Sequence, residues 1–195
     1  MVISERFQNE IEILWYRRKY LLLKEKLFNY RMRNYTRLSM IEDKVLIDYK
    51  MAYLEYIEGN KEGANLYFEI LEDIFQDEYN RDSMELQYYK YKWLKVNNNR
   101  ETLTNNEIID EMTEIYEYYD RIGDEEMKKM AYGNIIKFKG DMEEFLNVLE
   151  YILTNKKLTK NFLNSTLKDC ADISHNLYIK ALETIRKYYS DEKFI

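Results

Sequence analysis

The residue types that most often carry out catalysis are scarce in this chain. It has one histidine, His175, and one cysteine, Cys170, whereas a structural zinc site takes about four His or Cys ligands. Asp172 and His175 share a helical face, but a di-metal helix bundle needs several matching Glu-x-x-His elements. No Gly-x-x-x-x-Gly-Lys loop is present to hold nucleotide phosphates. We therefore interpret Cys170 as a core residue and His175 as a surface or interface residue, and we expect no metal and no cofactor.

Side chains suited to binding are abundant instead. Tyrosine occurs 20 times, and its flat apolar ring with one hydroxyl suits a binding groove, although filling the space between stacked helices is the better explanation for most of these residues. An amide can donate and accept at once and so hold the backbone of an extended peptide. We expect Asn134, Tyr89 and Trp93 to lie near a groove for a peptide or a protein partner.

The charge of the chain is unevenly distributed. Its net charge is −6, but residues 1–40 hold nine Lys or Arg against four Asp or Glu, a net charge of +5, which leaves −11 for the remainder. Such asymmetry favours contact with an acidic partner, with the acidic part of the same fold or with a second copy as a homodimer. A simple solvated surface is the alternative. Nucleic acid binding through Arg17, Arg18, Arg31 and Arg33 is disfavoured, because no helix-turn-helix signature follows.

These side chains must be positioned by helices. The chain has no Pro and only five Gly, which permits long helices and disfavours tight β turns. Residues 40–75 are typical of a helix hairpin that begins at a Ser39 and Glu42 capping pair and turns at Gly59. Ala52 and Ala64, with an aromatic residue at Phe68, have the small-small-aromatic spacing of tetratricopeptide hairpins.

The same signals predict helices along the rest of the chain. Residues 4–34 form one or two helices capped by Ser4, and residues 76–81 form a polar connector. An Asp82 and Glu85 capping pair opens a helix that the asparagines at 97–99 end. Capping pairs, two glycine stops and helical periodicity then predict the remaining helices, which span residues 104–122, 125–139, 141–153, 159–174 and 175–189.

The chain is therefore expected to be all-α, with an N-terminal helical bundle that continues into a short tetratricopeptide-like antiparallel array. We assign residues 1–38 to a basic helical segment, 39–189 to the repeats and 190–195 to a tail, all in one continuous domain. No apolar run approaches the roughly 20 residues of a membrane-spanning helix. The first residues do not resemble a secretory signal, and a single cysteine suits a reducing compartment, so we expect a cytoplasmic protein with no membrane partner.

Several short motifs carry a family resemblance. They are Leu14-Trp15-Tyr16, then Met40-Ile41-Glu42-Asp43 with Leu46, Tyr49 and Tyr53, and the aromatic, lysine-rich run at residues 82–96. About half of the chain thus resembles the Rap proteins, the response-regulator aspartate phosphatases of Gram-positive bacteria, and more loosely the wider RRNPP peptide-sensing regulators. The resemblance implies a helical bundle that docks a response regulator and repeats that bind a signalling peptide.

Two departures from the Rap pattern bear on activity. Rap phosphatases place a Gln directly after the Glu-Asp pair to position the attacking water, whereas this chain has Lys44. An ammonium cannot accept a hydrogen bond from water, so Lys44 disfavours an enzymatic function for this chain. The chain is also shorter than a full repeat array. The resemblance and the basic residues together predict a partner-binding set, which consists of Trp15, Arg17, Arg18, Glu42, Asp43 and Lys44.

Three functions stay open on these grounds. The leading one is a regulator of a bacterial or phage signalling circuit that binds a protein, such as a response regulator, or a short peptide. The second is a Rap-like phosphatase of a phosphorylated response regulator. The third is a nucleic-acid-binding regulator that uses the basic N-terminus.

Overall fold

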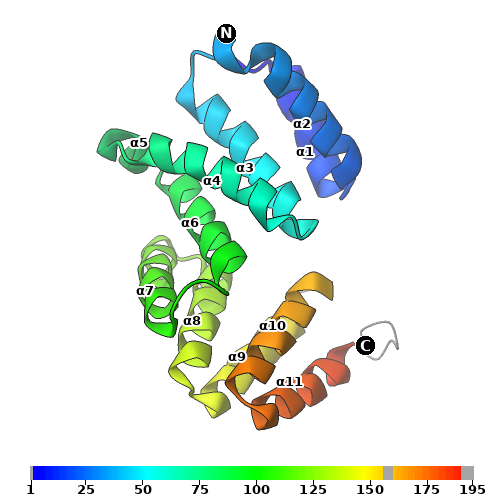
Figure 1. Cartoon of the computed structure of the whole chain (residues 1–195), viewed down its shortest axis with the longest axis vertical. Helices are drawn as coiled ribbons and strands as arrows, with labels where there is room; N and C mark the ends of the chain where they lie inside the picture. Colours follow the sequence, from blue (N-terminus) through cyan, green and yellow to red (C-terminus); the bar gives the residue numbers. More distant parts are fainter. Residues whose placement is uncertain (1, 156–159, 190–195) are drawn as a thin grey trace. The chain divides into compact units, whose positions relative to one another are not determined.

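The computed structural model describes residues 2–155 and 160–189, and all of the regular structure in these ranges is helical (Figure 1). The expectation of an all-α protein is confirmed. No helix within these ranges is both long enough and apolar enough to cross a membrane. The tail predicted at residues 190–195 lies outside the described residues.

The chain divides into two compact units, Met1–Asn99 and Arg100–Ile195. The boundary predicted between residues 38 and 39 falls inside the first unit, because the basic N-terminal helices share a core with the hairpin that follows them. Ile11, Leu23 and Leu27 from the N-terminal helices are fully buried with Ile47 and Leu54 from that hairpin. Each unit is described separately below.

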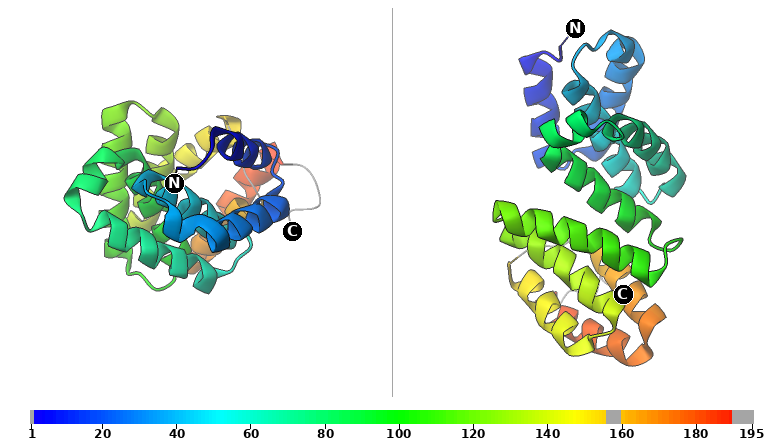
Figure 2. Two further views of the ribbon diagram at one scale, coloured as in Figure 1. Left: turned by 90° about the horizontal axis from the view of Figure 1, so that it is seen from above. Right: turned by 90° about the vertical axis from the view of Figure 1, so that its left-hand side faces the viewer.

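Consecutive helices of the first unit pack on one another (Figures 1 and 2). Helix α1 contacts α2, α2 contacts α3, and α3 contacts α4, while α6 packs on both α4 and α3. Helix α3 is therefore central and buries residues on several sides. The helices are α1 (Glu5–Tyr16), α2 (Tyr20–Asn34), the short 3-10 turn η1 (Tyr35–Arg37), α3 (Ile41–Ile57), α4 (Lys61–Phe75), α5 (Glu78–Ser83) and α6 (Glu85–Asn99).

The N-terminal segment is two helices rather than one. Ser4 caps α1 by accepting a hydrogen bond from the Phe7 N–H at 3.3 Å, as predicted. Helix α1 ends at Tyr16, and Arg18 adopts a left-handed backbone with φ of 53°, a conformation that costs a residue with a Cβ atom steric energy. This reversal lets α2 start at Tyr20 and fold back onto α1.

The hairpin of α3 and α4 has the predicted turn and packing. Gly59 has φ of +78°, which favours glycine, and Asn60 caps α4 by accepting a hydrogen bond from the Gly63 N–H at 3.1 Å. Ala52, Ala64 and Phe68 are buried in one cluster. The predicted capping pair of Ser39 and Glu42 is corrected, because the N-cap of α3 is Met40 and it makes no side-chain capping hydrogen bond.

Two predictions for residues 76–99 are also corrected. The polar connector contains the short helix α5, which Asp77 caps, so Asp82 lies within a helix and does not start one. Helix α6 runs through the asparagines at 97–99 rather than ending before them. Asn98 and Asn99 each donate to Asn65 Oδ1, at 3.0 and 2.9 Å. A tertiary hydrogen-bond network thus replaces the local stop that Asn was expected to provide.

The second unit follows the sequence prediction closely. Thr104 and Glu107 form a complete capping box, and Gly123 and Gly140 end their helices with φ of +74° and +81°. Helix α8 contacts α7 and α9, and α11 contacts α9 and α10. The helices are α7 (Asn105–Ile122), α8 (Glu125–Lys139), α9 (Met142–Asn155), α10 (Lys160–Ile173) and α11 (His175–Tyr188).

Candidate protein-interaction surface

Exposed large apolar side chains are concentrated at the start of the chain. The described residues include 15 of them, and eight fall in residues 2–40, about a fifth of the sequence. Scattered exposed apolar residues are normal, but contiguous ones mark interaction sites. The eight residues are Val2, Ile13, Tyr16, Leu21, Leu22, Phe28, Met32 and Met40.

Three of these residues form a stripe along α2. Leu21, Phe28 and Met32 are 81%, 51% and 70% exposed, and their spacing of seven and four residues places them on one face of the helix. The opposite face carries Leu23 and Leu27, which are both 0% exposed. We call Leu21, Phe28 and Met32 the α2 stripe. The exposed Glu25 lies on the same face between Leu21 and Phe28. Helix α2 is thus apolar on the side it buries, and the side it presents to solvent carries three large apolar side chains together with one carboxylate.

Basic side chains lie at both ends of the stripe. Arg17, Arg18 and Lys19 are exposed directly before α2, and Arg33 and Arg37 are exposed at its other end. An apolar patch with a charged rim is the usual anatomy of a protein interface, with the rim setting the sign of the partner. The positive charge of the residues at both ends of the stripe favours an acidic partner.

A buried ion pair fixes the orientation of α2. Asp48 of α3 is fully buried, Arg31 Nε donates to its Oδ1 at 2.9 Å, and the Tyr35 hydroxyl donates to its Oδ2. Burial raises the pKa of the Asp48 carboxyl, although the hydrogen bonds from Tyr35 and Arg31 act to lower it. The Arg31 guanidinium also lies 4.5 Å from the centre of the Tyr35 ring. This contact holds the stripe outward.

Two further lysines of α2 are also used inside the unit. Lys24 pairs with Glu55 at 2.9 Å and with Glu58 at 2.5 Å, both on the α3 side. Lys26 pairs with Glu10 of α1. The positive charge of residues 1–40 is therefore divided between an internal set and an exposed set. Arg31 belongs to the internal set, so the four arginines considered for nucleic acid do not act together.

Trp15 is a packing residue of this unit. Its ring lies 4.8 Å from that of Tyr53, and Lys50 Nζ lies 4.0 Å from the ring centre. Lys50 is itself buried and pairs with Glu12 at 2.9 Å, and burial lowers its pKa despite that pair. Trp15 therefore joins α1 to α3 rather than forming the exposed part of the predicted partner-binding set.

The three residues of the Glu-Asp-Lys run at the start of α3 differ in their exposure and contacts. Asp43 is buried and accepts a hydrogen bond from the Ile3 N–H at 2.8 Å, so its carboxylate holds the N-terminal segment. Glu42 is exposed, and Lys44 Nζ lies 5.6 Å from the centre of the Tyr35 ring. Of the predicted set, Arg17, Arg18 and Glu42 are exposed, whereas Asp43 is not presented to a partner.

The predicted groove residues belong to different units. Tyr89 and Trp93 are partly buried on α6 of the first unit, and Asn134 is on α8 of the second. The Asn134 amide donates to the Met130 carbonyl at 3.1 Å and accepts from Lys137 Nζ at 3.2 Å. The amide thus makes one donated and one accepted hydrogen bond within its own unit, and the contact of these three residues with a peptide stays a prediction.

Ionisable groups of the second unit serve its core. Lys137 is buried and pairs with Asp169 at 2.7 Å, and Arg100 reaches the same carboxylate at 2.5 Å. Cys170 is fully buried, and burial raises the pKa of its thiol to about 11. His175 is exposed and stacks on Tyr178. Within residues 2–155 and 160–189, no three His, Cys, Asp or Glu side chains lie close enough together to hold a metal ion.

The sequence interpretation missed the α2 stripe. Leu21, Phe28 and Met32 are not among the partner-binding residues predicted from the sequence. The seven and four spacing was available in the sequence, but its meaning depends on where α2 starts and on which face the core covers. Comparisons with protein-family models, with curated proteins and with solved structures find no match to this chain.

Proposed function

We propose that this chain is a regulatory protein that acts by binding an acidic partner protein through the α2 stripe and the basic residues at its ends. The observation that supports the proposal is the clustering of large exposed apolar side chains on α2, beside an excess of positive charge. The internal ion pairs support it further, because they keep the stripe turned to solvent.

The free energies expected for apolar burial and for exposed ion pairs favour the stripe as the source of affinity and the basic rim as the source of selectivity. Complete burial of a Leu, Phe or Met side chain contributes about 1.5 kcal/mol or more. Exposed ion pairs contribute about 0.2–1 kcal/mol each, but they raise association rates and exclude partners of the wrong sign. The fitting partner presents an apolar ridge with acidic neighbours, such as an amphipathic helix.

The resemblance to Rap proteins suggests a class of partner. A response-regulator receiver domain is the first candidate, with binding that sequesters the domain as the regulatory outcome. Sensing of a short peptide is the second mode that the resemblance suggests. A phosphatase is a weaker proposal, because Lys44 stands where the water-positioning Gln would be, and Asp43 is committed to the Ile3 N–H.

The direct test compares variants of the full chain. Proteins retained from the native host are identified and purified, and each is titrated by calorimetry against the wild type, a double variant L21S/M32S and a control L66S. Leu66 is 63% exposed and lies on α4, so it is not part of the stripe. We expect L21S/M32S to weaken binding of the true partner about 100-fold, and L66S to leave it unchanged. Equal affinity of all three proteins would contradict the proposal.

The basic rim is tested separately with R17E/R18E. This variant should slow association with the partner and reduce its dependence on salt, while the dissociation rate changes little. Sedimentation of the free protein then identifies self-association. A wild-type dimer that L21S/M32S converts to monomer would assign the stripe to a second copy of the chain instead of to an acidic partner.

Phosphatase activity is tested with response-regulator receiver domains. The purified chain is incubated with a phosphorylated domain, and phosphate loss is followed over time. Rapid loss that depends on Glu42 or Asp43 would replace the binding proposal with the enzymatic one. A gain of activity in K44Q alone would show that the docking geometry of a phosphatase is kept and that only the water-positioning amide is missing.

A further inference from the structure

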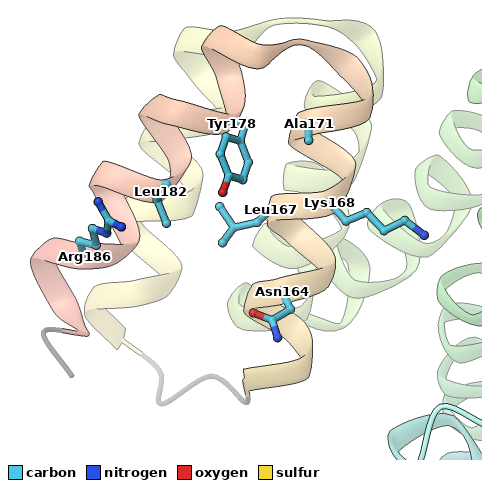
Figure 3. Close-up of a pocket in the computed structure, with 7 residues that line it drawn as sticks. All are labelled: Asn164, Leu167, Lys168, Ala171, Tyr178, Leu182 and Arg186. Atoms are coloured by element: carbon cyan, nitrogen blue, oxygen red, sulfur yellow. The ribbon is translucent and has the colours of Figure 1, made fainter. Parts of the chain in front are cut away.

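The second unit contains a pocket between α10 and α11 that is separate from the α2 stripe. Its volume is about 340 Å³, which falls in the range of sites for small molecules. We propose that this pocket binds a small aliphatic monocarboxylate, with its hydrocarbon chain between the two helices and its carboxylate at Arg186 (Figure 3).

The floor of the pocket is aliphatic. Leu167 and Ala171 line it from α10, and Leu182 lines it from α11 (Figure 3). Leu167 is buried and Leu182 is partly buried. Side chains of this kind attract the hydrocarbon portion of a ligand and offer it no hydrogen bond. They favour an alkyl chain over a sugar or a nucleotide.

Polar groups at the rim are available to a ligand. Tyr178 directs its hydroxyl between the helices toward Leu167 (Figure 3). Within the described part of the chain, neither this hydroxyl nor the guanidinium of Arg186 nor the amide of Asn164 has a side-chain hydrogen-bond or ion-pair partner. A guanidinium, a hydroxyl and an amide can all donate to a carboxylate.

The other charged residues near the pocket leave it suited to an anionic ligand. Lys168 also lines the pocket, but it extends from α10 away from α11 and pairs with Glu101 (Figure 3). Glu150 of α9 accepts a hydrogen bond from the Tyr188 hydroxyl at 3.0 Å and lies 3.9 Å from Lys187. No carboxylate lines the pocket among the described residues. Glu183 precedes Arg186 by three residues on α11, but no carboxylate among the described residues forms an ion pair with Arg186, so its guanidinium can take the carboxylate of a ligand.

The test uses the full chain with methyl groups labelled for NMR. Sodium octanoate is titrated below its aggregation concentration, with octanol and acetate as probes that keep only the chain or only the charge. We expect saturable shifts of the Leu167 and Leu182 methyl signals with octanoate. Octanol and acetate should bind at least tenfold more weakly. Equal shifts with octanoate and octanol, or no saturable shift with octanoate, would overturn the proposal.

Two variants assign the carboxylate contact. R186Q should weaken octanoate binding at least tenfold and leave octanol binding unchanged. K180Q removes an exposed lysine of the same helix outside the pocket and should bind octanoate as the wild type does. Arg186 is exposed, so R186Q should unfold at the wild-type temperature, which separates loss of the site from loss of the fold. Equal weakening by K180Q would reduce the effect to general charge attraction and refute the site.

A titration with peptides distinguishes the carboxylate of a small molecule from the C-terminal carboxylate of a peptide. Acetylated trileucine is titrated with a free carboxyl end and with an amidated end. Tighter binding of the free-acid peptide than of octanoate, with the same loss in R186Q, would replace the small-molecule ligand with a peptide C-terminus. Weaker binding of the peptide would support the aliphatic monocarboxylate. Neither outcome depends on the α2 stripe or its partner.

Discussion

Individual charged residues of the first unit decide how its helices are held. Asp48 is fully buried between Arg31 and Tyr35, whereas Asp43 accepts from the backbone of Ile3. Both carboxylates lie on α3, the helix that the others surround. Buried charges are costly unless they are paired and hydrogen-bonded. Their partners therefore determine which segments can pack on α3.

The Asp48 contact is tested with D48N. The substitution keeps the shape of the side chain but removes the charge opposite Arg31, so we expect the free energy of unfolding to fall by about 2 kcal/mol. Urea unfolding followed by circular dichroism measures the change. Asp73 is exposed on α4, and D73N should be within about 0.5 kcal/mol of the wild type. If the two variants unfold alike, the ion pair does not hold α2.

Lys50 makes the free energy of unfolding depend on pH. Burial lowers its pKa from 10.5, so over the range between the lowered value and 10.5 the unfolded chain binds the proton and the folded chain does not. Stability contributed by Lys50 therefore rises with pH across that range, and the cost of the buried charge is full below it. We expect K50M to equal or exceed the wild type in unfolding free energy at pH 7, by about 1 kcal/mol at most.

The difference between K50M and the wild type should shrink toward pH 10, and urea unfolding at both pH values measures it. Lys180 is exposed, and K180M should show no such trend. A difference that grows with pH would mean that Lys50 is stabilised as a cation, with the Trp15 ring and Glu12 outweighing its burial.

At the scale of the helix, local signals set most of the boundaries. The capping box at Thr104 and the glycine stops at residues 123 and 140 act over three or four residues. Where a longer-range contact competes, the local signal fails. Asn98 and Asn99 are the example, since their hydrogen bonds to Asn65 let α6 continue through them.

The glycine stop at the end of α7 gives a test at this scale. Gly123 has φ of +74° and no atom within 4 Å of an added Cβ, so the cost of a side chain there is conformational. We expect G123A to lower the free energy of unfolding by about 1 kcal/mol. Asn tolerates left-handed backbone better, and G123N should lose less than G123A. Thermal unfolding ranks the variants, and an equal loss would indicate crowding instead of backbone strain.

At the scale of the whole molecule, the chain consists of two units with separate cores. The first buries apolar residues of α1–α4 and α6, and the second buries residues of α7–α11. Each unit is about 100 residues long, which is enough for an independent hydrophobic core. The α2 stripe belongs to the first unit, and the pocket between α10 and α11 belongs to the second.

This division predicts that residues 1–99 fold when produced alone. We expect the fragment to show a helical circular dichroism spectrum and a single cooperative unfolding transition in urea. A shorter fragment, residues 1–75, removes α5 and α6 and should lose stability, because Tyr91 and Leu94 of α6 complete the core cluster around Phe68. An unfolded 1–99 fragment would show that the first unit depends on the second.

The all-helical class and most helix ends could be predicted from the sequence, because caps, glycine stops and amphipathic spacing are interactions between residues at most four positions apart. The candidate surface could not be predicted in the same way. Which charged residues face solvent depends on pairs such as Arg31 with Asp48 and Ile3 with Asp43, separated by 17 and 40 residues. Only the packing of α2 on α3 brings these groups together, and the same packing leaves Leu21, Phe28 and Met32 exposed.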